Sequence, residues 1–169
     1  VQLAHQHGAK VLVDAAQSIC HYPIDVRQWD VDFLVCSSHK MFGPSGAGAL
    51  FARREMHDQM KPVVMGGQMV DQVTTTGFTL QPPPYCFEAG SPPVESIIGW
   101  GAALKYLDGL GREAIAQRLS QLTTSLLSRL ADVPGIELLG PTDAESRGPL
   151  VSFNIDGLES HTIAKILSQ

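Results

Sequence analysis

The segment "VDFLVCSSHKMFGPSGAGALF", residues 31–51, carries the strongest structural signal in the chain. Its first half is a continuous apolar run up to Cys36, a pattern typical of a strand buried on both faces of a parallel sheet. The strand ends in the polar residues "SSHK" at 37–40, and the glycine-rich "GPSGAG" follows at 43–48. The order of these segments raises the question of why a lysine, Lys40, follows so closely on a buried strand.

Two further apolar runs flank this segment. "KVLVDAAQS", residues 10–18, predicts a buried strand that ends at Asp14, and "GAGALFARR", residues 46–54, predicts a third strand before a short helix over 55–61. Residues 65–93 have no helical period and are rich in Gly, Thr and Pro, which predicts an ordered, functional loop.

The C-terminal half is mainly helical in pattern. Apolar residues at helical spacing predict helices over 94–111 and 112–133, and Pro134-Gly135 ends the second. "IELLG" and "LVSFNI" then predict strands, and "ESHTIAKILSQ" predicts a helix with Ser160 as its N-cap. We therefore expect a second, smaller domain to start near Gly140.

Composition and charge exclude several classes of function. Hydrophobic residues make up 44% of the 169 residues and charged residues 17%, as in soluble globular cores. The net charge of −5 argues against nucleic-acid binding, and no apolar run is long enough to suggest a membrane span. The cysteines at 20, 36 and 86 form no CxxC pair, so we expect no disulfide framework and a cytoplasmic location.

Both ends of the chain cut through predicted secondary structure. "VQLAHQHGAKVLVD" has the pattern of a helix end that runs into a strand, with His5 and His7 expected at the surface. "SHTIAKILSQ" stops inside a predicted helix. We therefore expect the chain to be a fragment of a longer enzyme.

The strand ends carry the chemistry, because open α/β sheets bind ligands at the carboxyl edge of their strands. Asp14 is either a turn or cap residue or a carboxylate that keeps a heterocyclic nitrogen protonated. Gln17 follows about one helical turn later and can face the same ligand.

Lys40 follows a buried strand and precedes two apolar residues, so we expect it to be desolvated. Desolvation favours the neutral, nucleophilic amine that forms Schiff bases, as pyridoxal-phosphate enzymes require. The hydroxyls of Ser37 and Ser38 and the imidazole of His39 would then be placed to bind the cofactor phosphate.

Two competing interpretations fail on spacing. "GPSGAG" is not a GxGxxG directly after a strand and lacks the GK[ST] ending of a P-loop, which disfavours nucleotide binding. The six histidines form no HExxH, and no Cys/His pair has ligand spacing, so no metal site is predicted.

Taken together, "VLVDAAQS", "DFLVCSSHKMFGPSGAGALF", the "GG" at 66–67 and "FEAGSPP" resemble the fold-type I pyridoxal-phosphate enzymes of the class V aminotransferase group. Within that group the chain looks like the cysteine desulfurases and selenocysteine lyases that serve iron–sulfur cluster assembly. The resemblance implies an α/β fold. Residues 1–139 would be part of the large cofactor-binding domain, a mostly parallel sheet flanked by helices, and residues 140–169 the start of a small α+β domain.

The resemblance also implies a role for each matching residue. Lys40 would be the Schiff-base lysine and the proton shuttle at the substrate Cα. Asp14 would pair with the pyridinium nitrogen of pyridoxal 5'-phosphate, and Gln17 with its phenolic oxygen. The phosphate ligands would be Ser37, His39 and, in a homodimer, Ser91 of the partner subunit. Ser91 stands where the family often has Thr, and both offer a hydroxyl.

The implied reaction converts L-cysteine to L-alanine and an enzyme persulfide, and "GFTLQPPPYCFEAG" resembles the subgroup that works with a SufE-type sulfur acceptor. In the family, the persulfide-forming cysteine and the arginine for the substrate carboxylate would lie beyond residue 169. We therefore expect no turnover from the chain alone. The alternatives are a kynureninase-like, epimerase-like or aminotransferase member of the group, and a non-catalytic α/β binding module.

Overall fold

The structure, a computed structural model, describes residues 1–169. The chain divides into two compact units, one of Val1–Cys20 with Ile24–Asp108 and the other of His21–Pro23 with Gly109–Gln169. This division falls near the end of helix α4 (Val94–Leu110). The boundary expected near Gly140 concerns the domains of a complete enzyme and stays a prediction.

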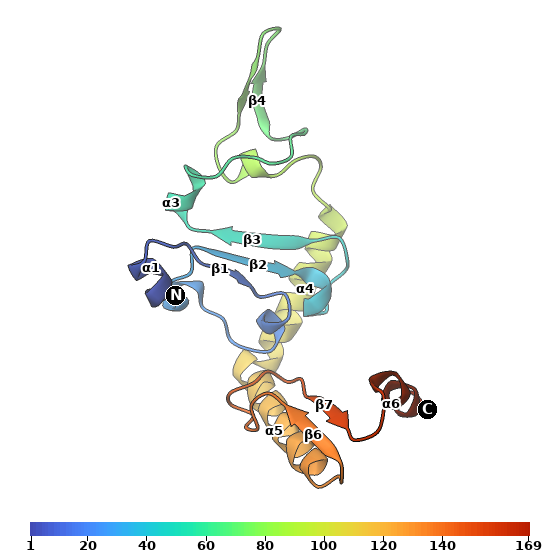
Figure 1. The fold of residues 1–169 in the computed structure, drawn as a ribbon. Helices are drawn as coiled ribbons and strands as arrows, with labels where there is room; N and C mark the ends of the chain where they lie inside the picture. The colour runs from blue at the N-terminus through green and yellow to red at the C-terminus, as the bar shows by residue number, and fades with distance from the viewer. The chain divides into compact units, whose positions relative to one another are not determined.

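The first unit is built on a three-stranded sheet in the order β1-β2-β3 (Figure 1). Strands β1 (Leu12–Asp14) and β2 (Phe33–Ser37) are parallel, with Asp14 opposite Val35. Strand β3 (Gly48–Ala52) is antiparallel to β2, with Ser37 opposite Gly48. The three predicted strands are confirmed. The third runs in the opposite direction because the short return after β2 suits an antiparallel neighbour, whereas a parallel crossover needs about a dozen residues or more.

The core of this unit lies beside β1 and β2. Ala15, Val31 and Leu34 are buried at its centre. Six partly buried residues pack around them: Val11, Val13, Ile19, Ile24, Val26 and Cys36. Leu12 and Leu50 stay 56% and 51% exposed. The apolar runs had suggested a sheet buried on both faces. Within this chain that expectation is wrong, because these side chains remain exposed.

Short helices connect the strands. Helix α1 (Gln2–Gln6) precedes β1, α2 (Val26–Trp29) precedes β2, and α3 (Arg54–His57) follows β3. The Asp25 carboxylate caps α2 by accepting hydrogen bonds from the N–H groups of Arg27 (2.8 Å) and Gln28 (3.2 Å). The unit also contains three 3₁₀ helices: η1 (Ser18–Cys20), η2 (Ser38–Met41) and η3 (Tyr85–Phe87).

The loop predicted over 65–93 contains an antiparallel hairpin. Strands β4 (Val70–Val73) and β5 (Phe78–Leu80) pair with Val73 opposite Phe78, and the hairpin extends away from the sheet in Figure 1. The turn between them closes by a hydrogen bond from Thr74 N–H to Gly77 O (2.8 Å). These strands were not predicted from the sequence, because four and three residues, mostly exposed, are too few to show an alternating pattern.

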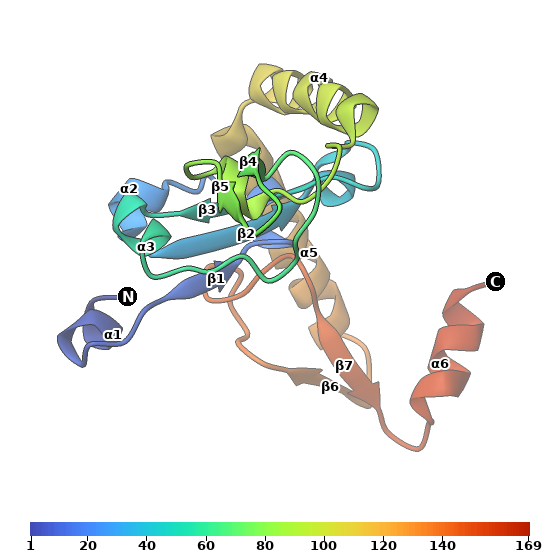
Figure 2. The same cartoon turned by 90° about the horizontal axis from the view of Figure 1, so that it is seen from above.

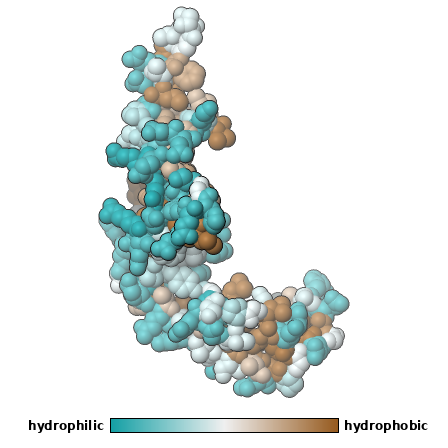
Figure 3. All heavy atoms as spheres, turned by 60° about the vertical axis from the view of Figure 1, so that its left-hand side comes forward, coloured by the Kyte–Doolittle hydropathy of each residue, from teal (hydrophilic) through white to brown (hydrophobic).

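The second unit packs helices against a two-stranded sheet. Helix α5 (Arg112–Ala131) is followed by the antiparallel strands β6 (Ile136–Leu139) and β7 (Ser152–Ile155), and then by α6 (Ser160–Leu167). These elements confirm the predicted helix and strands. The predicted N-cap is wrong by one residue: Glu159 occupies that position and Ser160 is the first helical residue. Figure 3 shows hydrophobic side chains at the surface, and Leu150 and Leu167 of this unit are about 70% exposed.

No helix in the chain is both long enough and apolar enough to cross a membrane.

Candidate active site

The carboxyl ends of β1 and β2 lie at the same edge of the sheet. The two strands are parallel and Asp14 lies opposite Val35, so Asp14 and Ser37 both leave the sheet at this edge. The turns that follow the strands also meet, because η1 contacts η2. The convergence expected from neighbouring strands is therefore present: a carboxylate, a hydroxyl, an imidazole and an amine occupy one region.

Helix η2 presents two of these groups to solvent. Ser38 and Met41 are buried, with exposed fractions of 0% and 3%, while His39 and Lys40 are exposed. In a 3₁₀ helix residues three apart lie on the same face, so the buried pair occupies one face and the exposed pair the others. The expectation of a desolvated Lys40 is wrong for this chain, because the buried side of η2 is occupied by its neighbours.

Ser38 has a structural role in closing the loop that follows. Its hydroxyl donates to the carbonyl oxygen of Pro44 or to that of Ala47 (3.0 Å), and its N–H donates to Ala47 O (3.1 Å). The N–H of Gly43 donates back to Ser38 O (3.0 Å). Since these bonds occupy the buried hydroxyl, Ser38 is not available for a phosphate as first considered, and Ser37 and His39 remain the candidates.

Asp14 and Gln17 lie in the turn after β1. One carboxylate oxygen of Asp14 accepts a hydrogen bond from the N–H of Ala16 (2.9 Å), and the side chain is exposed. Part of this carboxylate therefore serves the turn, as one of the two interpretations expected. Gln17 is exposed in the turn before η1 and not on an α-helix, so the argument from helical spacing was wrong.

The distant sequence motifs meet around Ser91. The N–H of Gly90 donates to Gly67 O (2.8 Å), which joins "FEAGSPP" to the "GG" at 66–67. A pocket of about 290 Å³ is lined by residues 46–48 and 88–93 together with Ile97. Ser91 therefore lies beside the glycines that follow Lys40 in sequence.

The sequence profile of the family described as Aminotransferase class-V matches residues 1–169. The chain belongs to this family. A probable cysteine desulfurase of Synechocystis sp. is 44% identical over 169 residues, which cover 99% of this chain and 40% of the relative. The apo structure of the cysteine desulfurase from Thermococcus onnurineus NA1 has a TM-score of 0.89 at 35% identity, over 99% of this chain and 42% of that one.

A structure of C-DES with glycine covalently linked to its pyridoxal-phosphate (PLP) cofactor has a TM-score of 0.80 at 26% identity. The match covers 95% of this chain and 42% of C-DES. The chain spans about 40% of the length of the curated relatives it matches. The predicted resemblance and the fold class are confirmed by these matches.

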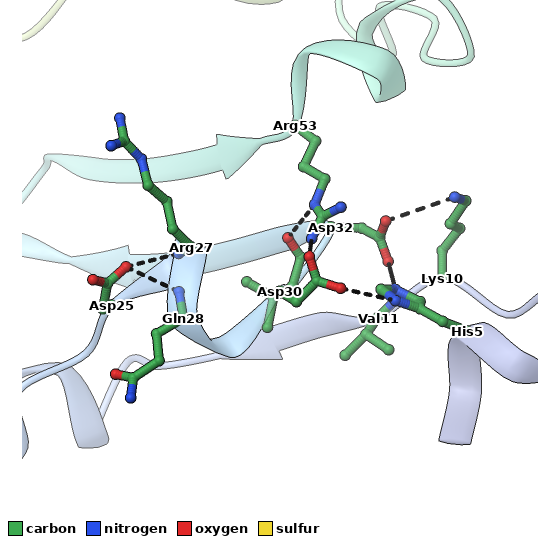
Figure 4. A network of polar contacts seen from close by, with 10 residues as sticks. His5, Lys10, Val11, Asp25, Arg27, Gln28, Asp30, Asp32 and Arg53 are labelled. Carbon is green, nitrogen blue, oxygen red and sulfur yellow. Dashed lines mark hydrogen bonds and ion pairs between the residues drawn. The ribbon is translucent and has the colours of Figure 1, made fainter. Parts of the chain in front are cut away.

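A second polar network lies at the other end of the strands of this class V aminotransferase chain (Figure 4). The Asp32 side chain, 2% exposed, accepts hydrogen bonds from the N–H of Val11 (2.8 Å) and pairs with His5 Nε2 (2.8 Å). Lys10 Nζ lies 3.7 Å from its other oxygen. These contacts connect α1 and the start of β1 to the start of β2. His5 stands at the end of α1 as expected, but its side chain is only 26% exposed and is paired with Asp32.

Asp30 and Arg53 extend this network to β3. The Arg53 guanidinium pairs with the Asp30 carboxylate, and its Nε–H donates to Val31 O (2.9 Å). His5 Nδ1 lies 3.4 Å from Asp30. The network therefore links the start of β2 to the end of β3 as well as to α1. The sequence carries a weak signal for this network, namely two acids separated by one residue in "WDVDF" and an arginine after the third apolar run.

The Val11 N–H contributes most to holding the pKa of Asp32 at about 2, with His5 and Lys10 adding to it against the cost of burial. The Arg53 guanidinium lowers the pKa of Asp30 in the same way. Both carboxylates are therefore ionised in the neutral range. A buried ionised carboxylate with several partners is a structural element of the fold.

Proposed function

We propose that this chain is the cofactor-binding part of a PLP-dependent cysteine desulfurase, which converts L-cysteine to L-alanine and an enzyme persulfide. The observation that carries the proposal is the exposed Lys40 at the edge where the parallel strands end, beside Asp14, Ser37 and His39. Relatives named cysteine desulfurase match 99% of the chain and support this assignment.

The groups at this edge fit PLP in their chemistry. A carboxylate suits the pyridinium nitrogen, an amide the phenolic oxygen, a hydroxyl and an imidazole the phosphate, and a primary amine the aldehyde. All five side chains are at least partly exposed at one edge. The residues that would hold the cofactor are Asp14, Gln17, Ser37, His39 and Lys40.

When bound, PLP would withdraw electrons from the substrate Cα. The Lys40 amine would bind the cofactor aldehyde in the resting enzyme, and after release by the substrate it would move the Cα proton. Asp14 would keep the ring nitrogen protonated through its carboxylate, one oxygen of which the Ala16 N–H already orients. Ser37 and His39 would anchor the phosphate and so fix the ring relative to Lys40.

None of the three cysteines in the chain suits the persulfide role. None of the three is joined in a disulfide. Cys20 and Cys86 are buried, and burial raises the pKa of the partly buried Cys36, which disfavours the reactive thiolate. We therefore place the persulfide-forming cysteine, and the arginine for the substrate carboxylate, in parts of the enzyme outside residues 1–169.

The partners belong to the same proposal. As the family resemblance implies, the complete enzyme would be a homodimer in which Ser91 of the partner subunit binds the phosphate. We further propose a SufE-type sulfur acceptor, a role in iron–sulfur cluster assembly, a cytoplasmic location and selenocysteine as a second substrate. The domain boundary near Gly140 completes this picture.

The direct test is borohydride reduction of the complete enzyme after addition of PLP, followed by peptide mapping. We expect a reduced adduct on Lys40 and none in Lys40→Ala, together with alanine formation from cysteine by the wild-type enzyme. An adduct without alanine formation favours another class V enzyme. Absence of any adduct favours the non-catalytic binding module and contradicts the proposal.

The 169-residue chain alone is a second test. It lacks a suitable thiol, so we expect no release of alanine from cysteine even when PLP is added in excess. Release of alanine by the isolated chain would contradict the assignment of the sulfur-handling residues to the rest of the enzyme.

A further inference from the structure

One face of helix α4 is fitted closely to the loop that follows Lys40. Ser96, Gly99 and Trp100 lie on this face, since residues three and four apart in a helix are neighbours. The Ser96 hydroxyl donates a hydrogen bond to Ser45 O (2.9 Å). Figure 2 shows α4 running past the end of β2, where this loop begins.

The fit leaves no room for a side chain at Gly99. A Cβ there would lie 2.6 Å from Pro44 Cγ and 3.1 Å from Pro44 Cδ, closer than real atoms approach. The glycine therefore allows the helix to touch the rigid proline ring directly. Because the ring cannot rotate away, any added methyl group must displace the loop or the helix.

A second close contact lies one residue further along the face. A Cβ on Gly43 would meet Trp100 Cδ1 at 3.2 Å and Ser38 O at 3.0 Å. The indole Nε1 of Trp100 is buried and has no hydrogen-bond partner. The ring is therefore held by packing against the loop. Further along α4, the ring of Tyr106 meets Phe42 edge to face, with centroids 6.4 Å apart.

These contacts reach Lys40 by a short route. Pro44, which touches Gly99, offers one of the two carbonyl oxygens that lie within hydrogen-bond distance of the Ser38 hydroxyl. Ser38 begins η2, and Lys40 is the third residue of that helix. Lys40 itself is exposed, and no hydrogen bond or ion pair within the chain engages its side chain. Its position therefore depends on its backbone, which the loop and α4 hold.

We propose that Ser96, Gly99 and Trp100 are positioning residues that hold the loop of residues 38–48 and thereby place the Lys40 amine for its reaction. The proposal rests on the proposed function, since it concerns Lys40 as the cofactor lysine. It adds a set of residues that touch neither cofactor nor substrate. Their effect passes through Pro44 and the Ser38 hydroxyl.

The test compares Gly99→Ala with Gly101→Ala in the complete enzyme. Both changes add one methyl group to α4, but a Cβ on Gly101 meets nothing within 4 Å. Gly101→Ala is thus a matched control for helix propensity. Ser96→Ala, which adds no volume, provides a second variant should Gly99→Ala fail to fold.

The first readout needs no cofactor. Hydrogen exchange of the Ser38 and Gly43 amides, which donate to Ala47 O and Ser38 O, reports opening of the loop. We expect about tenfold faster exchange of these amides in Gly99→Ala and wild-type rates in Gly101→Ala. Ser96→Ala should shift exchange in the same direction by a smaller factor. Equal exchange in wild type, Gly99→Ala and Ser96→Ala would overturn the proposal.

The second readout is the enzyme loaded with PLP. We expect kcat of Gly99→Ala to fall by about 10- to 100-fold, with KM little changed. We also expect a shift in the pH at which the visible absorption band of the bound cofactor changes. Gly101→Ala should keep the wild-type profile. A wild-type enzyme without an adduct on Lys40 would contradict the proposed function, whereas a wild-type adduct with identical profiles in both glycine variants would contradict the positioning role alone.

Discussion

The two ends of the β1–β2 pair use charged residues in opposite ways. Where the strands begin, Asp32 is buried and bound by a backbone N–H and by His5. Where the strands end, Asp14 and Lys40 are exposed, and only one oxygen of Asp14 is bound, within its own turn. The first set is fully committed to the fold, whereas the second leaves its reactive atoms free.

This difference separates charges that stabilise from charges that react. A buried carboxylate must be paired, because an unpaired one costs several kcal/mol. An exposed amine contributes little to stability, and its reactive nitrogen stays accessible to a ligand. Substitutions at the two ends should therefore fall into two groups, one that changes stability and one that changes activity.

The largest effect is expected for Lys40→Ala in the complete enzyme. Desulfurase activity should fall by at least about 1,000-fold, because the change removes the amine that moves the Cα proton. Stability should change by less than about 0.5 kcal/mol, since the side chain is exposed. Alanine release and urea unfolding measure the two quantities. Lys61→Ala, at another exposed lysine, should leave both unchanged.

Asp32→Ala should show the reverse pattern. It leaves the Val11 N–H and His5 without their partner, and we expect a loss of about 3 kcal/mol in the free energy of unfolding. Urea unfolding followed by tryptophan fluorescence measures this loss. The control is Asp71→Ala at an exposed position of β4, which should stay within about 0.5 kcal/mol of wild type. If Asp32→Ala changed the free energy of unfolding no more than Asp71→Ala does, the buried carboxylate would not stabilise the fold, and the proposed difference between the two strand ends would be wrong.

Because the Asp32 carboxylate is paired, we expect the stability of the fold to depend on pH in the acid range. The pKa of Asp32 in the folded chain is about 2, below the ordinary value of 3.8. A lowered folded pKa adds stability that is complete above about pH 4 and is lost as the pH falls through 2, by about 2 kcal/mol. Unfolding free energies between pH 2 and 5 should show this slope in wild type and a smaller one in Asp32→Asn. If the unfolding free energies of wild type and Asp32→Asn changed with pH in the same way, the lowered pKa of Asp32 would not be the cause of the slope.

The smallest effect concerns the outer part of the network. Arg53→Lys keeps the positive charge near Asp30 but loses the Nε–H bond to Val31 O. We expect a loss in the free energy of unfolding that is clearly smaller than that of Asp32→Ala, measured by thermal or urea denaturation. Arg54→Lys, at the exposed neighbour, is the matched control and should be neutral.

The strands and long helices could be predicted because their signals are local. A continuous apolar run marks β2, and residues at helical spacing mark α5. The β4–β5 hairpin was missed because its strands are short and exposed. The Asp32 network was missed because its partners lie 21 and 27 residues away in sequence, and only the folded sheet brings them together.

The candidate site divides in the same way. The meeting of Asp14 with residues 37–40 follows from two parallel strands with polar ends, so the sequence was sufficient to predict it. The exposure of Lys40 was not predictable, because it depends on which face of η2 is buried by Ser38 and Met41. The contact of Gly99 with Pro44 was likewise not predictable, because it joins residues far apart in the sequence and no local sequence pattern indicates it.

The antiparallel pairing of β2 with β3 has a consequence for how this region can vary. Ser37 lies opposite Gly48, and the Ser38 N–H bond to Ala47 O closes the loop between them. Deleting or inserting one residue in this loop would slip the register of β3 and exchange the two faces of that strand. The number of residues in this loop is therefore tied to the pairing of β2 with β3, and it can change only together with the register of the sheet.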